Sequence, residues 1–121
     1  MIPDATQLVL AENQFNDPPE EGQQFFIVTV SATYEGEGSS TLRAGNTFQV
    51  VGDSAVAYKT FDPSCGVIPN DFAYTEVFSG GTIEFNVCFS VKSGDTSSLV
   101  MFTEDYADFD SDKRVWFALS P

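Results

Sequence analysis

The sequence contains no histidine, and its five lysine and arginine residues stand against 18 aspartate and glutamate residues. Without histidine, the Ser-His-Asp and Cys-His arrangements of nucleophilic enzymes cannot form, and the usual general base near neutral pH is missing. No glycine-rich phosphate loop is present, because Gly80-Gly81 reads as a turn before a strand. A glycosidase-type carboxylate pair would need a substrate cleft, which a small domain rarely provides. We therefore expect that the protein is not an enzyme.

The shortage of basic residues leaves a formal net charge of −13 and an isoelectric point near 4.1. Nucleic-acid-binding proteins collect lysine and arginine to neutralise phosphates, so nucleic acid is not an expected partner. Anionic membrane surfaces are repelled by the same charge. The acidic surface either keeps the protein in solution or attracts a basic partner or cations, and both interpretations remain open.

Long apolar runs are also missing from the chain. No segment approaches the ~18 residues of a membrane span, and no basic-then-apolar signal peptide opens the sequence. We expect no direct membrane insertion by this domain. Residues 1–6 are expected to be a disordered or artificial start. If the natural protein is exported, its signal segment was removed ahead of Met1.

The dominant pattern that is present is the alternation of apolar and polar residues with a period of two. Segment Ile83–Val91 alternates cleanly, which is typical of a half-buried antiparallel strand. Segment Gln24–Tyr34 alternates too, but Phe25 and Ile27 lie opposite its main apolar face, so we expect its first half to be covered on both sides. Further strands are predicted at Gln7–Glu12, Thr47–Val51, Ala57–Phe61, Ala73–Phe78, Ser98–Glu104 and Arg114–Leu119.

Turn-forming residues separate these segments, as in Asn16-Asp17-Pro18-Pro19 and Ser79-Gly80-Gly81. No stretch of ten or more residues keeps a helical period. A chain of 121 residues with 12 phenylalanines is sufficient for one core and too short for two domains. Seven or eight short strands with such turns predict an all-β fold, an immunoglobulin-like antiparallel β-sandwich forming a single domain over residues 1–121.

The two cysteines, Cys65 and Cys88, do not form a C-x-x-C redox motif, and without histidine no further ligands complete a zinc site. Cys88 lies on the polar face of Ile83–Val91, and Cys65 lies in a loop rich in proline and glycine. A bond between them would pin this loop onto the outer face of the sheet and stabilise the fold by about 3 kcal/mol. Two unpaired cysteines in a cytosolic protein are the alternative, and thiol titration of denatured, unreduced protein distinguishes the two.

Three stretches taken together carry a family resemblance. Asn16-Asp17-Pro18-Pro19-Glu20-Glu21-Gly22 leads into an apolar strand, Gly80-Gly81 precedes Phe85-Asn86-Val87-Cys88-Phe89-Ser90-Val91, and the chain closes on Val115-Trp116-Phe117-Ala118-Leu119. From about Leu8 to Leu119 the chain resembles a bacterial extracytoplasmic domain family of unknown function, which shares the immunoglobulin-like sandwich of the mycobacterial immunoprotective secreted antigen.

The resemblance implies an exported protein or lipoprotein, with an immunoglobulin-like fold and no catalytic residues to carry over. In such relatives the cysteine matching Cys88 tends to have an upstream partner, which is consistent with Cys65. This chain departs from the family in lacking the signal segment and low-complexity spacer, and in its high acidity.

The strongest local constellation of polar residues is the acidic segment Glu104–Asp112 between two predicted strands. Carboxylates at alternate positions resemble the start of a calcium loop, because hard cations require several oxygen ligands. An EF-hand is excluded, since Lys113 and Leu119 occupy the glycine and glutamate positions. A looser surface Ca²⁺ site and a solvated acidic turn both remain open, and calorimetric titration with Ca²⁺ separates them. The candidate ligands are Glu104, Asp105, Asp108, Asp110 and Asp112.

Aromatic residues offer a second candidate surface. Sugar-binding platforms use exposed tryptophan and tyrosine rings, whereas the abundance of phenylalanine favours a core. The candidate binding aromatics beside the acidic segment are Tyr106 and Phe109; packing of these rings under loops is the alternative.

The sequence thus predicts a non-catalytic extracytoplasmic module with an interaction or structural role. Its partner would be a protein or cell-surface component, and it would be secreted or anchored through a segment outside this chain. No cofactor is expected beyond the candidate calcium. A calcium-dependent or carbohydrate-binding accessory module of a larger secreted protein or lipoprotein is the alternative, and a purely structural spacer is a further one.

Overall fold

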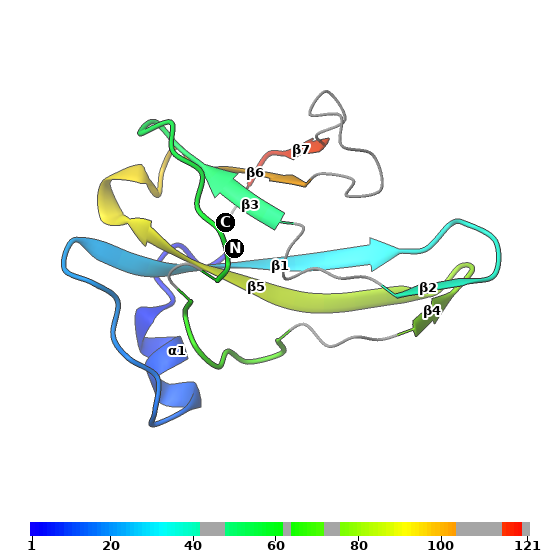
Figure 1. Ribbon diagram of the computed structural model, residues 1–121, viewed down its shortest axis with the longest axis horizontal. Helices are drawn as coiled ribbons and strands as arrows, with labels where there is room; N and C mark the ends of the chain where they lie inside the picture. The colour runs from blue at the N-terminus through cyan, green and yellow to red at the C-terminus, as the bar shows by residue number, and fades with distance from the viewer. Residues whose placement is uncertain (42–47, 62–63, 72–75, 104–114, 120–121) are drawn as a thin grey trace.

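The computed structural model describes residues 1–41, 48–61, 64–71, 76–103 and 115–119 (Figure 1). Its strands pair antiparallel in three sheets, which confirms the predicted all-β class. The helical elements are α1 (Thr6–Glu12) and a 3-10 turn at Ser93–Asp95. The strands are β1 (Gln23–Thr33), β2 (Ser39–Thr41), β3 (Phe48–Val51), β4 (Glu76–Phe78), β5 (Thr82–Lys92), β6 (Val100–Thr103) and β7 (Val115–Phe117).

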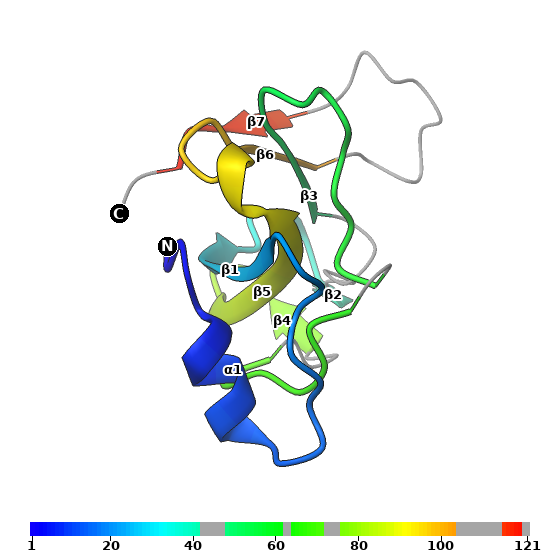
Figure 2. The same ribbon diagram turned by 90° about the vertical axis from the view of Figure 1, so that its left-hand side faces the viewer.

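The centre of the molecule is a long two-stranded ribbon formed by β1 and β5. The register pairs Phe26 with Phe89 and Ile27 with Cys88, and it continues along all 11 residues of each strand. Helix α1 lies on one side of the ribbon, and the sheet of β3, β6 and β7 lies on the other, as both views show (Figures 1 and 2). The short β2–β4 pair continues from one end of the ribbon.

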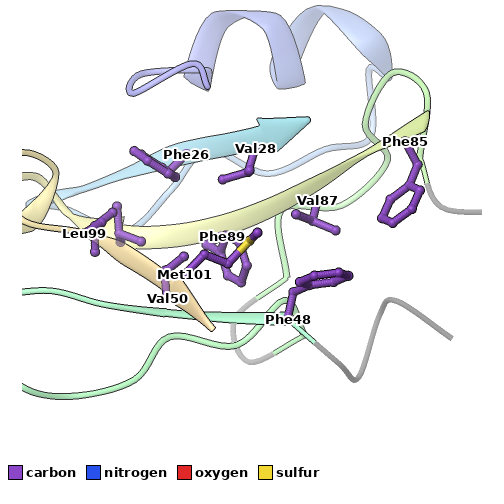
Figure 3. Close-up of a cluster of buried hydrophobic side chains, with 10 residues drawn as sticks. Phe26, Val28, Phe48, Val50, Phe85, Val87, Phe89, Leu99 and Met101 are labelled. Carbon is purple, nitrogen blue, oxygen red and sulfur yellow. The ribbon is translucent and has the colours of Figure 1, made fainter. Parts of the chain in front are cut away.

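Side chains between the ribbon and the three-stranded sheet form the larger cluster, called here the sheet-side cluster (Figure 3). Strands β1 and β5 supply alternate residues to it, and β3 and β6 close it from the other side. The rings of Phe48 and Phe85 meet with centroids 6.2 Å apart. The members are Phe26, Val28, Phe48, Val50, Phe85, Val87, Phe89, Val91, Leu99 and Met101.

The opposite face of the ribbon buries a second group of side chains, called here the helix-side cluster. Its members are Ala5, Val9, Phe25, Ile27, Cys65, Ile68 and Cys88. The expected covering of the first half of β1 on both sides is confirmed, because Phe25 to Val28 are all buried. The expectation that Cys88 lies on a polar outer face is wrong, since α1 and the loop carrying Cys65 cover that face.

Helix α1 occupies the segment in which a strand at Gln7–Glu12 was predicted, so that prediction is wrong. The physical reason is the spacing of buried residues: Ala5 and Val9 are four apart, share one helical face and are both buried, while Leu8 is exposed. A short apolar run such as this one fits the strand period and the helix period equally well, so the sequence pattern alone did not distinguish a helix from a strand.

Residues ahead of α1 pair with β1, where the sequence predicts a disordered start. The Ile2 N–H donates to the Ile27 carbonyl at 2.8 Å, and the Ala5 N–H donates to the Phe25 carbonyl at 2.7 Å. These bonds satisfy backbone groups along the outer edge of β1, and Ala5 is buried in the helix-side cluster. The start of the chain therefore contributes to the core.

The remaining strand predictions hold to different extents. Strands β3, β4, β6 and β7 lie within their predicted segments. Segment Ala57–Phe61 forms only isolated bridges, Val50 with Tyr58 and Phe61 with Ser64, instead of a strand. The described strands form open sheets of two and three strands, so two facing sheets with seven or eight strands are not what these residues show. Among the described residues, no helix is long and apolar enough to cross a membrane.

Candidate functional site

A disulfide bond joins Cys65 to Cys88, which confirms the predicted pairing and excludes two free thiols. The Cα atoms are 6.2 Å apart, and the two residues are 23 positions apart in the sequence. Both cysteines are buried among the apolar side chains of the helix-side cluster. The bond therefore fixes the loop around Cys65 against β5, beneath the segment that follows α1.

Asn16 connects that loop to the segment after α1. Its amide nitrogen donates to the carbonyls of Val9 at 2.8 Å and Val67 at 2.6 Å, and its amide oxygen accepts from the Val67 N–H at 2.8 Å. Gly66 stands beside this amide with φ +90°, and a Cβ there would overlap the Asn16 oxygen. One side chain thus holds three backbone groups, and Gly66 leaves the space that it needs.

The loops fixed by Asn16 and the disulfide enclose a shallow surface depression of about 410 Å³. We call it the disulfide hollow and define it by Phe15, Asp17, Pro18, Pro19, Glu20 and Cys65. Phe15 is 83% exposed, the largest exposure among the large apolar side chains of the described residues. Two carboxylates, from Asp17 and Glu20, share the lining with this exposed ring.

No serine–histidine pair lines the disulfide hollow. Its two serines are Ser64 and Ser90, and neither has a histidine to activate it because the chain contains none. The Ser90 hydroxyl is buried and donates to the Gln23 side-chain oxygen at 2.8 Å. Apolar rings, proline and carboxylates together are the surface chemistry of recognition.

A buried carboxylate, Asp95, lies just beyond the end of β5, at the end of the ribbon where Gln23 pairs with Lys92. It accepts hydrogen bonds from the Ser54 hydroxyl at 2.5 Å and from the Tyr58 hydroxyl at 2.6 Å. The Ser54 hydroxyl, followed by the Tyr58 hydroxyl, holds the pKa of the Asp95 carboxyl below its usual value, and desolvation only partly opposes this. Burial, followed by the bond to Asp95, raises the pKa of Tyr58.

These bonds give the Asp95 network a structural role. The Ser98 hydroxyl donates to the Asp95 backbone carbonyl at 2.9 Å and accepts from the Asp53 N–H at 2.9 Å. The network thereby ties the loop after β3 to the 3-10 turn that follows β5, and it leaves Asp95 buried within the protein. A carboxylate held in this way positions backbone rather than substrate.

Trp116 lies on the outer face of the three-stranded sheet and is 54% exposed. Its ring packs against Phe102 on β6, with centroids 4.9 Å apart and planes tilted by 41°. The register aligns Gln49 with Phe102 and Phe102 with Trp116, so the three residues form a row across β3, β6 and β7. The sequence pattern placed Trp116 on the face opposite Val115 and Phe117, and its exposure identifies this face as the outer one.

The site residues predicted from the acidic segment lie outside the described residues. They are the candidate calcium ligands Glu104, Asp105, Asp108, Asp110 and Asp112, and the candidate binding aromatics Tyr106 and Phe109. Within the described ranges, no group of three or more histidine, cysteine, aspartate or glutamate residues could hold a metal ion. The calcium and aromatic hypotheses for this segment therefore stay predictions.

Sequence reasoning missed Asn16 and Asp95. The signal for Asn16 was its place in the turn motif Asn16-Asp17-Pro18-Pro19, which was interpreted only as a chain reversal. Asp95 follows the last apolar residue of β5 in Ser93-Gly94-Asp95, where an acidic residue normally indicates a solvated turn. Only its partners, Ser54 and Tyr58, distinguish it from such a turn.

Comparison with known proteins found no matching family model, no matching curated protein and no matching solved structure.

Proposed function

We propose that this chain is a non-catalytic extracytoplasmic interaction module, secreted or held at the cell surface of a bacterium through a segment outside this chain. In this proposal it belongs to the immunoglobulin-like extracytoplasmic family that its motifs resemble, members of which are exported proteins and lipoproteins. The partner is a protein or other cell-surface component, and the disulfide hollow is the surface that meets it.

The compartment is supported by the disulfide. The Cys65–Cys88 bond is buried in the helix-side cluster, where it acts as a structural crosslink. Structural disulfides persist in oxidising compartments and are rare in the cytosol. The layered arrangement, with the β1–β5 ribbon facing the sheet of β3, β6 and β7, supports a sandwich-like fold (Figure 2).

The observation that carries the interaction role is the exposure of Phe15. An 83% exposed phenylalanine is costly in water, and this one lies on a segment held by Asn16 and the disulfide. Large aromatic side chains on rigid, concave surfaces are typical anchors of protein interfaces. The arrangement therefore favours a binding surface over an inert spacer.

Site-specific photo-crosslinking tests this function. Phe15 is replaced by p-benzoyl-phenylalanine, and the purified module is irradiated with the extracytoplasmic fraction of cells that encode it. Phe78, which is 64% exposed on β4 at the other end of the ribbon, carries the same probe as the matched control. We expect a discrete adduct from position 15 and none from position 78. Equal labelling at both positions, or no adduct at 15, contradicts the proposal.

A carbohydrate-binding accessory module is the second candidate, and Trp116 is the observation that favours it. Its half-exposed ring, packed against Phe102 and in line with Gln49, provides an apolar platform with an amide in the same row. Sugar rings stack on exposed tryptophan faces, and amides bind their hydroxyl groups.

Fluorescence tests this second candidate directly, because Trp116 is the single tryptophan of the chain. Titration with soluble cell-wall polysaccharide or chitin oligomers would shift and enhance its emission if sugars stack on it. The Trp116→Phe variant, followed by pull-down on the same insoluble polymer, is the control. Unchanged emission at millimolar sugar rules out this face as a carbohydrate platform.

A further inference from the structure

We propose that the disulfide hollow recognises an arginine side chain within a basic peptide segment of the partner. This inference rests on the proposed interaction function and adds the chemical class of the group that is bound. It follows from three features of the hollow, namely an exposed ring beside two acidic residues, an apolar part of the lining, and charge complementarity to a cation.

The first feature is the combination of Phe15 with Asp17 and Glu20. A planar guanidinium stacks on an aromatic face and at the same time donates parallel hydrogen bonds to a carboxylate. An exposed phenylalanine and two carboxylates that share one concave surface provide both kinds of contact. A lysine ammonium would meet the same charges, but it stacks less well on an aromatic ring and cannot form a bidentate hydrogen bond with a carboxylate.

The second feature is the apolar part of the lining. Pro18, Pro19 and Cys65 line the same hollow as the two acidic residues. Arginine covers apolar surface with its three methylene groups while its charged end stays near water. The apolar residues of the lining therefore suit the methylene groups of arginine, and the two acidic residues suit its guanidinium.

The third feature is charge complementarity. Among the residues that the structure describes, the lining contains two acidic residues and no lysine, arginine or histidine. With a net charge of −13, a second copy of this chain or any acidic protein would be repelled. An apolar hollow with two acidic residues in its lining, on a molecule of this net charge, selects a cationic partner.

The hollow is also held in place before it binds. Asn16 ties its rim to Val67, the disulfide fixes Cys65, and the Gln23 N–H donates to the Glu20 carbonyl at 2.9 Å. Rigid surfaces lose less conformational entropy on association, so a small contact area yields more affinity.

The test uses a fluorescein-labelled heptapeptide in which three arginines are separated by Gly-Ser pairs, measured by fluorescence anisotropy at physiological salt. The same peptide with three lysines is the first comparison. We expect the arginine peptide to bind at least about threefold more tightly, the difference that one aromatic stacking contact supplies. Amide shifts in a ¹⁵N-labelled sample are expected to centre on residues 15–17, 20 and 64–66.

Matched variants separate the hollow from the general acidity of the protein. Phe15→Ser and the double variant Asp17→Asn/Glu20→Gln are each expected to weaken arginine binding by about tenfold. Their controls, Phe78→Ser and Glu35→Gln/Glu37→Gln, remove the same ring and the same charge at the other end of the ribbon, and we expect changes below about twofold. Circular dichroism confirms that each variant is folded.

The proposal is overturned if the lysine and arginine peptides bind equally, or if the distant charge variant weakens binding as much as the one in the hollow. Either result means non-specific attraction to an acidic protein. A discrete crosslink from position 15 to a partner without an arginine-bearing segment would overturn the arginine assignment and leave the interaction function standing. No crosslink at 15 would remove the interaction function itself.

Discussion

Asn16 and Gly66 show how one amide and one glycine shape the surface of this protein. Asn16 satisfies three backbone groups on two segments that are far apart in the sequence. Gly66 takes a positive φ, and it also leaves the space that the amide occupies. The two residues act as a pair, so changing either one should disturb the other.

Replacing Gly66 by alanine tests this pairing, with Gly80→Ala as the matched control. Gly80 has nearly the same φ of +84°, but a Cβ there meets nothing within 4 Å. We expect Gly80→Ala to cost about 1 to 2 kcal/mol for the left-handed backbone alone. Gly66→Ala should cost roughly 1 kcal/mol more, because an Asn16 hydrogen bond must break. Urea unfolding of both variants measures the difference, and equal losses would contradict the pairing.

Asp95 makes stability depend on pH at acid values. Its folded-state pKa is lowered by Ser54 and Tyr58, so its stabilising contribution is complete above the unfolded value of about 3.9 and disappears as pH falls through the folded value. We expect Asp95→Asn to be less stable than the wild type at pH 7, and the gap to close at acid pH. Urea unfolding between neutral and acid pH measures this gap, and a constant gap would show that ionisation is not what stabilises.

A neighbouring carboxylate provides the control for the Asp95 prediction. Asp53→Asn removes a carboxylate from the same loop, where only the backbone N–H of Asp53 joins the network, and should change stability by less than about 0.5 kcal/mol.

Tyr58 has a raised pKa, so the contribution of its neutral hydroxyl should be lost as pH rises above about 10. Tyr58→Phe is expected to remove this alkaline loss and to cost roughly 1 to 2 kcal/mol at pH 7.

At the scale of elements, the two long strands were predictable and helix α1 was not. Strong alternation over nine or more residues specifies a strand, and β5 covers its predicted segment while β1 covers all of its own except Tyr34. The seven residues of α1 are too few to establish a period, and contact with the helix-side cluster decides their conformation. The shared burial of Ala5 and Val9 is visible only after the loop around Cys65 is placed.

The conformation of this segment is testable by a pair of adjacent substitutions. In the helix, Val9 is fully buried and Leu8 is exposed, whereas a strand would place Leu8 and Leu10 together on its more apolar face, opposite Val9. We expect Val9→Ala to cost about 1 to 3 kcal/mol and Leu8→Ala less than about 0.5 kcal/mol in urea unfolding. The reverse order of losses would indicate a strand.

At the scale of the whole molecule, net charge is the property that sequence alone predicts most directly. A charge of −13 on 121 residues repels itself most strongly in the compact state. We expect urea stability to rise between about 0.02 and 0.5 M NaCl, because salt shortens the reach of this repulsion. The variant Glu35→Gln/Glu37→Gln should show a weaker dependence. Stability that stays constant or falls with salt would contradict this expectation.

The fold class, the disulfide and the double covering of β1 followed from pattern and residue type. The arrangement of three open sheets did not follow, because strand length and pairing depend on contacts distant in sequence. The disulfide hollow was equally hidden: the proline turn and the cysteine loop were each recognised, but only the Asn16 bonds bring them together. Side-chain hydrogen bonds that join two loops in this way leave no periodic pattern in the sequence.

The double burial of β1 has a consequence for how the ribbon is aligned. Four consecutive apolar residues, Phe25 to Val28, would remain apolar on both faces after a slip of one position, so hydrophobicity there discriminates weakly between correct and shifted pairing. Three side-chain hydrogen bonds break on such a slip: Gln23 with Ser90 and Thr33 with Thr82 near the two ends of the ribbon, and Thr29 with Asn86 near its centre. Hydroxyl and amide groups along the ribbon, more than its four consecutive apolar residues, therefore select the native alignment of its two long strands.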